Sequence, residues 1–426
     1  MIQTNKLRKR GTKTVSVLFL FAIGQCLLYF NVNQQLLGGS SLPPEGPTMI
    51  NGLQLAKQVK VQKEFIQMIE ESQKTTDCGD ARILVADESI KPYDGFALEV
   101  RMMSYFLQIA VASQRALVIK QEFYSAYAPN CSLPLNPPVA PPTTTPKESD
   151  NEGHSFHCLW NKVSECTERE NVGGRATEYA KPDPMGVGIL EDREDSYYFN
   201  TKYFGAQRIV VLDQFPHVDR TSNIHVLPYW ERTYGTFWVR SQVSSYWWTN
   251  YKTELLKEEI EPRLTKLEEP YIGFQIRMTD NVYHLRKHFS RNATITRSFE
   301  RYMGIANDIR KENTKLRHIF VATDNEDAAA AAVKNNYEGW TFHIQDGVTR
   351  GGKDEKMMWF QESRSDSVGL IGADLEMLRR ADYLVGSFQS NVFRLAAELN
   401  TGYHTKKYLW DQRRIFSVDV EWYQDP

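Results

Sequence analysis

The second half of the chain alternates short apolar runs with longer amphipathic stretches. The apolar runs have the length and the β-branched and aromatic content of buried strands, and a stretch at helical spacing follows each of them. These runs are YIGFQI (271–276), HIFVAT (318–323), WTFHI (340–344) and DYLVGS (382–387). Because helices that alternate with short apolar strands build parallel sheets, we expect an α/β fold with a doubly wound parallel sheet.

The helices predicted for this half have recognisable starts and breaks. They span 254–269, 296–312, 325–335, 366–381 and 390–400. Pro262 should break the first of them, because proline lacks the backbone donor that a helix interior needs. Asn325 and Ser390 stand where N-caps are expected, since their side-chain oxygens can accept from the first free N–H groups.

The first half predicts a smaller unit of the same kind. ARILVA (81–86) reads as a strand, 95–113 as a helix behind Gly95, and ALVI (116–119) as the next strand. RIVVL (208–212) is a further strand, whereas the Pro- and Thr-rich stretch 128–154 is an insertion loop. We therefore expect an amino-terminal lobe at 75–235 and a carboxyl-terminal lobe at 236–426.

The amino terminus predicts a membrane anchor. Residues 1–14 are rich in Lys and Arg, and the apolar run 15–30 carries no charge. Basic residues on one flank predict a cytoplasmic tail, a transmembrane signal anchor and a lumenal remainder. A cleaved signal peptide is the alternative, but no small-x-small site follows the apolar run. Residues 31–74 should form a stem and a helix. The helix either packs on the globular part of the chain or joins two copies of the chain as a dimer, and we favour packing.

Charge and cysteine usage narrow the protein class. The net charge of −2 provides no basic surface for nucleic acid, so we expect no nucleic-acid partner. Outside the apolar run, an even number of cysteines predicts two disulfides with three pairings open. They are Cys78, Cys131, Cys158 and Cys166. Sequons predict N-glycosylation at Asn130 and Asn292.

Polar residues follow the predicted strands at the points where ligands bind in open α/β sheets. They are Arg277 and Asp280 after the first strand, Asp324 after the second, and Ser387, Ser390 and Asn391 after the fourth. Asp374 lies in the helix before the fourth strand. A helix N-terminus attracts phosphate, a guanidinium binds it bidentately, and a carboxylate can read a guanine edge. The pattern therefore indicates a cleft for an anionic ligand.

Each of these residues also has a structural interpretation. Arg277 could form a salt bridge, and Asp324 or Ser390 could simply cap a helix. The acidic run DNED (324–327) is typical of a first helical turn rather than of a metal site, so we expect no metal. No dinucleotide fingerprint, phosphate-binding loop or metalloprotease motif occurs in the sequence.

Longer motifs resemble a known family. GFQIRMTDN (273–281), HIFVATDNEDA (318–328) and the segment 372–399 resemble the three signatures of the α1,6-fucosyltransferases, glycosyltransferase family 23 (GT23). CGDARILVA (78–86) with 94–119 is similar to the family's amino-proximal nucleotide-fold segment, and FWVRSQVSSYWW (237–248) to its Trp segment.

The resemblance implies a GT-B-like fold of two Rossmann-like lobes, GDP-fucose as the donor, inversion at the sugar carbon and no metal or other cofactor. By position, Arg277 matches the arginine that holds the diphosphate, Asp374 the carboxylate that reads guanine, and Ser390 and Asn391 the polar pair at the phosphate. Gln275, Asp280, Asp324 and Ser387 complete the expected donor site. The family's disulfides imply Cys78–Cys166, which leaves Cys131–Cys158.

The sequence also departs from the family pattern. Gln275 stands at the usual His of the first signature, Met278 at its second Arg and Asn281 at its Lys. The family's catalytic Glu has no match downstream. His284 and His288 lie nearby, and either could serve as general base because its ordinary pKa is close to neutral pH.

Together these features predict an inverting fucosyltransferase, a single-pass type II Golgi membrane protein with a lumenal catalytic domain. The expected acceptor is a glycan or glycoprotein, with the N-glycan core through an α1,6 linkage as the family default. One alternative is an inactive homologue that binds a nucleotide sugar or a glycan; another is a fucosyltransferase with a different acceptor. A homodimer is a further partner that the sequence allows.

Overall fold

The structure is a computed structural model. It describes residues 52–74, 78, 80–86, 95–119, 156–164, 166, 209–212, 226–250, 256–264, 266–267, 270–277, 298–334, 337–346, 364–408 and 414–419. Residues 50–426 form one compact unit, and the predicted tail and anchor at 1–30 lie outside the described residues. Among the helices that the structure describes, none has the length and apolarity needed to cross a membrane.

The described part of the second half forms a five-stranded sheet in the order β6-β5-β4-β7-β8. Every neighbouring pair is parallel, as the alternation of helices and strands predicts. The strands are β4 (Tyr271–Ile276), β5 (His318–Thr323), β6 (Thr341–Ile344), β7 (Tyr383–Gly386) and β8 (Ile415–Ser417). The short edge strand β8 was not predicted.

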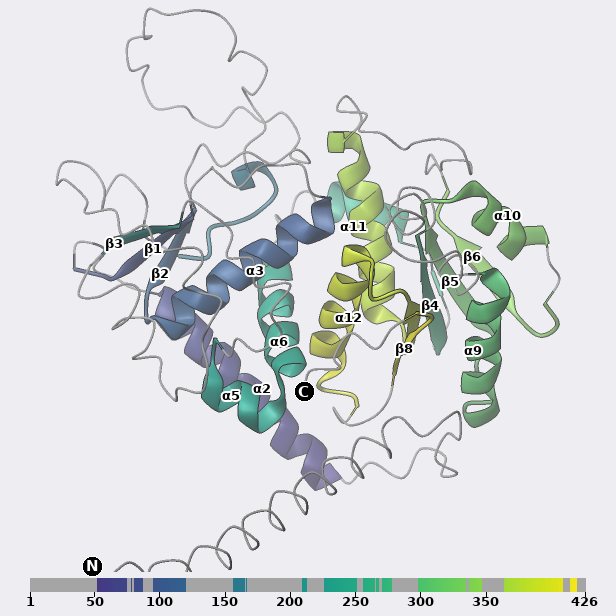
Figure 1. Cartoon of the computed structure of the whole chain (residues 1–426), viewed down its shortest axis with the longest axis horizontal. Helices are drawn as coiled ribbons and strands as arrows, with labels where there is room; N and C mark the ends of the chain where they lie inside the picture. Colours follow the sequence, from purple (N-terminus) through teal and green to yellow (C-terminus); the bar gives the residue numbers. More distant parts are fainter. Residues whose placement is uncertain are drawn as a thin grey trace, which may run out of the picture. The chain divides into compact units, whose positions relative to one another are not determined.

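Helices cover both faces of this sheet, with α11 and α12 on one side and α9 and α10 on the other (Figure 1). Alternate residues of β5 serve the two cores: Ile319 and Val321 pack with α9 and α10, whereas Phe320 and Ala322 face the other core. The sheet is therefore doubly wound. The helices are α9 (Phe299–Glu312), α10 (Glu326–Lys334), α11 (Arg364–Arg380) and α12 (Asn391–His404).

The first half forms a three-stranded parallel sheet in the order β2-β1-β3 among its described residues. Its elements are β1 (Ile83–Ala86), α3 (Phe96–Ala112), β2 (Ala116–Ile119) and β3 (Ile209–Leu212). Almost every residue of α3 is buried. A disulfide joins Cys78 to Cys166, the pairing that the family resemblance implied. Cys158 is disulfide-bonded too, whereas Cys131 lies outside the described residues.

The helix α2 (Gly52–Gln73) packs on the second half of the chain, as favoured from the sequence. Phe65 and Ile69 are fully buried. Gln58 donates to the backbone oxygen of Thr405 over 2.6 Å, and Gln62 donates to Gly402 O over 3.1 Å. These bonds hold α2 against the carboxyl-terminal end of α12, so α2 is part of the compact unit.

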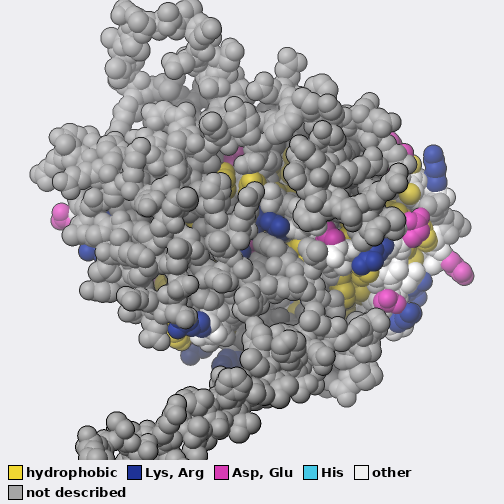
Figure 2. Space-filling view, viewed as in Figure 1, with side chains coloured by type: hydrophobic (Ala, Val, Ile, Leu, Met, Phe, Trp, Pro, Cys, Tyr) yellow, Lys and Arg dark blue, Asp and Glu magenta, His cyan; other side chains and the backbone are white. Residues whose placement is uncertain are grey.

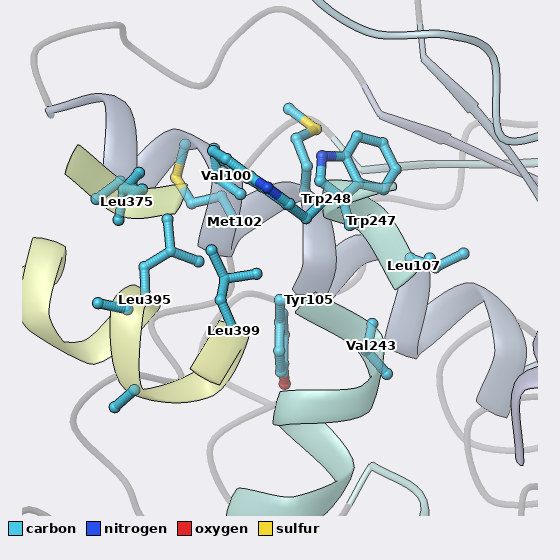
Figure 3. Close-up of a cluster of buried hydrophobic side chains, with 14 of the residues drawn as sticks. Val100, Met102, Tyr105, Leu107, Val243, Trp247, Trp248, Leu375, Leu395 and Leu399 are labelled. Carbon is cyan, nitrogen blue, oxygen red and sulfur yellow. The ribbon is translucent and has the colours of Figure 1, made fainter. Parts of the chain in front are cut away.

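The Trp segment of the sequence forms the central helix α6 (Thr236–Trp248), which follows the short α5 (Pro228–Tyr234). Helix α6 packs against α3 on one side and α12 on the other. Figure 3 shows Tyr105, Val243, Trp247 and Leu399 among the side chains that α3, α6 and α12 direct into one apolar cluster. After α6, the η6 (Leu256–Ile260) and η7 (Glu261–Arg263) turns meet just before Pro262, where a helix break was predicted.

Close contact between α12 and α6 depends on Gly402. A Cβ atom at this position would lie 2.0 Å from Ser245 Oγ and 2.7 Å from the backbone oxygen of Ser241. By contrast, a Cβ atom at Gly304 in α9 would meet nothing within 4 Å. The two helical glycines therefore differ in packing, although both carry the same intrinsic helix cost.

We expect Gly402→Ala to destabilise the protein by about 1–3 kcal/mol, because the added methyl group forces the two helices apart. The matched control Gly304→Ala should stabilise it by about 0.5–1 kcal/mol through helix propensity alone. Denaturant unfolding of the two variants measures both effects. Equal effects of the two substitutions would contradict the described packing.

Candidate functional site

The strands β4 and β7 lie side by side at the point where the sheet changes direction. From β4 the chain adds β5 and β6 on one side and β7 and β8 on the other. In open α/β sheets this arrangement leaves a crevice outside the carboxyl ends of the two central strands. The residues that follow β4 and β7 are therefore the first candidates for ligand contact.

Arg277 follows β4 directly and lies beside the residue that follows β5. Its Nε is 4.0 Å from Asp324 Oδ2, and the two side chains are 30% and 25% exposed. A partly exposed pair at this separation adds little stability, of the order of 1 kcal/mol or less. The predicted salt bridge at Arg277 thus exists, but it is loose enough to exchange for a ligand.

Asn325, and not Asp324, caps the helix that follows β5. Asn325 Oδ1 accepts from the Ala328 N–H over 2.8 Å, and the Asn325 N–H donates to Thr323 Oγ1 over 3.1 Å. The cap predicted at Asn325 is confirmed. Asp324 therefore faces Arg277 for a reason other than helix capping.

Ser390 occupies the N-cap position of α12 but does not cap the helix with its side chain. The residue is 1% exposed, and no group among the described residues hydrogen-bonds to its Oγ. A buried hydroxyl without a partner costs about 1–3 kcal/mol. Since a helix N-terminus favours anions, this hydroxyl and the first N–H groups of α12 form a ready site for phosphate oxygens.

The bend from β7 to α12 is held by Asp419, which follows β8. Its carboxylate accepts from the hydroxyl of Ser387, from the Phe388 N–H over 3.2 Å and from Ser417 Oγ over 2.8 Å. Arg394 donates to the Phe388 carbonyl from inside the helix. Sequence reasoning missed Asp419 because the short strand β8, which precedes it, was not predicted; the apolar residues Ile415, Phe416 and Val418 are a weak signal for that strand.

Gln275 is the next-to-last residue of β4 and is 5% exposed. Its backbone oxygen accepts from the hydroxyl of Tyr302 over 3.0 Å. Its side-chain Oε1 makes no hydrogen bond within the described part of the chain. Gln275 stands where the family has His. Like Ser390, it therefore has a buried oxygen without a partner among the described residues, close to the end of β4, the strand that Arg277 follows.

Asp374 belongs to α11 and is linked to the end of β6. Gln345 follows β6 and is buried, and its amide donates to Asp374 Oδ1 over 2.7 Å and to the Leu370 carbonyl over 3.1 Å. Neighbouring strands are about 4.8 Å apart, so the ends of β7, β4, β5 and β6 span about 14 Å. A nucleoside diphosphate is of similar length, so a ligand of this kind fits along the carboxyl edge of the sheet.

Helix α11 is fixed by a buried carboxylate close to Asp374. Glu376 accepts from Arg379, from Arg380 and from Trp248 Nε1 of α6. Burial opposes the charge on Glu376, but the hydrogen bonds and charges of the two arginines outweigh it and lower its pKa. This network orients the helix that carries Asp374.

Several predicted site residues lie outside the described residues. They are Asp280, His284, His288 and the sequon residues Asn130 and Asn292. On the face shown in Figure 2, described acidic and basic side chains are interspersed, which agrees with the small net charge. Within the described residues, no group of three or more His, Cys, Asp or Glu side chains could hold a metal ion.

Several strongly perturbed titratable groups lie at the opposite, amino edge of the sheet. Asp382 precedes β7; its carboxylate accepts from the Tyr408 hydroxyl over 2.6 Å and from Lys407 over 3.1 Å. Burial and the bond to Asp382 raise the pKa of Tyr408 to about 12. Burial lowers the pKa of Arg414, which donates to the backbone carbonyl of Asp382, to about 10. This network joins the starts of strands and the end of α12, so its role is structural.

Comparison with known proteins shows which family the chain resembles. Residues 222–412 match the family described as "Alpha-(1,6)-fucosyltransferase N- and catalytic domains". An "Alpha-(1,6)-fucosyltransferase" of Caenorhabditis elegans is 23% identical over 354 residues, which are 80% of this chain and 53% of that protein. The second half of the chain is therefore similar to the α1,6-fucosyltransferases. The chain spans about half the length of this curated relative.

Two solved structures are also similar to this chain. Fucosyltransferase NodZ from Bradyrhizobium has a TM-score of 0.37 and 13% identity, with 74% of this chain and 92% of that chain covered. POFUT1 in complex with GDP-fucose has a TM-score of 0.40 and 14% identity, with 80% and 98% covered. The family match contains all of the described site residues from Gln275 to Asn391.

The pKa of His404 predicts a pH dependence of stability. Its Nε2 lies 3.2 and 3.0 Å from the carbonyl oxygens of Arg380 and Ala381, so Nε2 carries the proton. Its Nδ1 has no partner among the described residues. Burial and the charges of Arg414 and Lys407 lower the pKa of His404 to about 3, against a smaller opposing effect of Asp382.

Because the unfolded chain takes up this proton near pH 6.5, stability should fall as the pH drops below that value. Between pH 7 and pH 5 the loss from His404 is about 2 kcal/mol. His404→Gln, whose amide can donate to the same carbonyls, should remove most of that slope in denaturant unfolding. The control His343→Gln should remove a smaller part, since His343 is only partly buried. Parallel pH profiles for wild type and His404→Gln would contradict the assignment.

Proposed function

We propose that this protein transfers fucose from GDP-fucose to a glycan acceptor with inversion at the sugar carbon. The observation that carries the proposal is the buried hydroxyl of Ser390, which has no hydrogen-bond partner among the described residues. It lies at the start of α12, after β7, the strand that pairs with β4. The family match supports the activity, and the name of the C. elegans relative supports an α1,6 linkage. As acceptor we propose the N-glycan core.

The diphosphate of the donor would bind between β4 and β7. Its oxygens would accept from the Ser390 hydroxyl, from the first N–H groups of α12 and from the Arg277 guanidinium, which exchanges Asp324 for the ligand. Ser387 would keep the bend in place through Asp419. Preset donors of this kind cost no reorganisation when negative charge develops, which is why they stabilise a transition state effectively.

The guanine base would lie toward β6. Asp374 would accept from the paired N–H donors of the guanine edge, while Gln345 holds one of its oxygens in place. Gln275 lies near the end of β4, and its buried Oε1, which has no partner among the described residues, would accept from a hydroxyl of the donor. Asp280 completes the donor site in this proposal.

In the reaction, the acceptor hydroxyl attacks the anomeric carbon from the face opposite the diphosphate. The new carbon–oxygen bond forms as the bond to the phosphate oxygen breaks, and a general base takes the hydroxyl proton. We assign the base to His284 or His288 on sequence grounds. Arg277 and the N–H and hydroxyl donors at the start of α12 would stabilise the negative charge that develops on the leaving GDP. We therefore propose that no metal or other cofactor is required.

The proposal includes a setting for this reaction. The two parallel sheets would be the two lobes of a GT-B-like fold, with GDP-fucose held by the lobe at 236–426. The apolar run 15–30 would anchor the protein in the Golgi membrane with the catalytic domain in the lumen, where glycoprotein acceptors occur. A homodimer is compatible with this topology, and no nucleic acid takes part.

Arg277→Ala tests the central assignment. We expect kcat/KM for fucose transfer to fall by about 10²–10³-fold, because one preset charge is lost from the site of the developing negative charge. The thermal midpoint should change little, since Arg277 and its pair with Asp324 are partly exposed. The measurement is GDP release from GDP-fucose with an array of glycan acceptors, beside calorimetric titration of GDP.

Arg317→Ala is a matched control, because Arg317 is an exposed arginine that directly precedes β5, at the amino edge of the sheet. It should keep wild-type turnover. Wild-type turnover in Arg277→Ala would remove Arg277 from its assigned role. Wild-type protein that binds GDP but releases none from GDP-fucose with any acceptor would favour the inactive, nucleotide-sugar-binding homologue.

A further inference from the structure

An arginine from the first half of the chain reaches the start of α12. Arg101 lies on α3 and is 9% exposed. Its Nε is 3.2 Å from Glu398 Oε1, and its Nη1 donates to Asn391 Oδ1 over 3.2 Å. Ser244 of α6 donates to the other oxygen of Glu398 over 2.7 Å. The three helices α3, α6 and α12 are thus joined by one buried polar chain.

Packing alone does not explain this buried pair. Figure 3 shows that Val100 and Met102, the neighbours of Arg101 on α3, belong to an apolar cluster with Leu395 and Leu399 of α12. A buried ion pair in such surroundings is often no more stabilising than apolar residues of similar volume, because both charges lose their hydration. A further reason is therefore needed for a charge that contacts the first residue of α12.

The bond to Asn391 fixes the direction of its amide group. A guanidinium has only donors, so the atom of Asn391 that it contacts must be the carbonyl oxygen. The amide nitrogen then points away from Arg101, and Nδ2 makes no hydrogen bond to a described residue. Next to it lies the Ser390 hydroxyl, which is also without a described partner. Two donors are thus presented together at a helix N-terminus.

We infer that Arg101 is a positioning residue of the donor site. It holds the Asn391 amide with its nitrogen toward the diphosphate, and Glu398 keeps the Arg101 guanidinium in the required plane. This inference rests on the proposed function. It assigns a role in donor binding to a residue that lies outside the three signatures, on a helix of the other sheet.

A double-mutant cycle tests the inference. Arg101→Lys keeps a positive charge beside Glu398 but cannot donate from two fixed nitrogens, so the amide loses its orientation. We expect Arg101→Lys and Asn391→Ala each to weaken GDP binding about tenfold in calorimetric titration, as the loss of one hydrogen bond to a charged group predicts. The double variant should bind no more weakly than either single variant, because Arg101 acts through Asn391.

Ser244→Ala is the control. It removes a partner of Glu398 without touching Asn391, so it should lower the thermal midpoint but leave GDP affinity within about twofold. Asn391→Asp covers the case in which Arg101→Lys fails to fold, since Asn391 is only partly buried and its Oδ1 can still accept from Arg101. We expect this variant to weaken GDP binding more than Asn391→Ala, because an oxygen replaces the donor that faces the phosphate.

The outcomes are separable. Multiplicative losses in the cycle, unchanged GDP affinity in Arg101→Lys, or equal affinities of Asn391→Asp and wild type would overturn the positioning role while leaving the transferase proposal intact. A wild-type protein that neither binds GDP nor turns over GDP-fucose would overturn both. If Ser244→Ala lost as much GDP affinity as Arg101→Lys, the effect of the Arg101 substitution would be general destabilisation, and the positioning role would be wrong.

Discussion

Parallel strands bring all of their carboxyl ends to one edge, and the neighbouring pair β4 and β7 marks the position where the chain winds in both directions. That arrangement places Arg277 beside the bend that starts α12, although more than 100 residues separate them in sequence. Each of the other site groups depends on it: Asp324 faces Arg277 from β5, Gln345 holds Asp374 from β6, and Asp419 holds the bend from β8.

The two edges of the sheet use polar groups differently. At the amino edge, Asp382 accepts from the Tyr408 hydroxyl and Arg414 donates to the Asp382 carbonyl, so this network stabilises strand starts, and burial shifts the pKa values of Tyr408 and Arg414. At the carboxyl edge, the buried oxygens of Ser390 and Gln275 have no partner among the described residues. Buried atoms without a described partner occur at the amino edge too, at His404 Nδ1 and Arg414 Nε. The position of Ser390 at a helix N-terminus beside the end of β4 is therefore what indicates the ligand.

The sequence predicted what depends on local pattern. The strand and helix order from Tyr271 to Asn400 follows from periodicity, and the cap at Asn325 follows from the chemistry of its side chain. Contacts between distant segments were not readable: nothing in the sequence pairs Arg101 with Asn391 or Asp419 with Ser387. The strand β8 was missed because three residues are too short for a periodic signal.

A crystal structure of the protein with bound GDP tests the account most directly. It should place the diphosphate outside the carboxyl ends of β4 and β7, with its oxygens within hydrogen-bonding distance of the Arg277 guanidinium and of the Ser390 hydroxyl, and the guanine edge against Asp374. A nucleotide bound at the amino edge beside Asp382, with Arg277 still paired to Asp324, would contradict it.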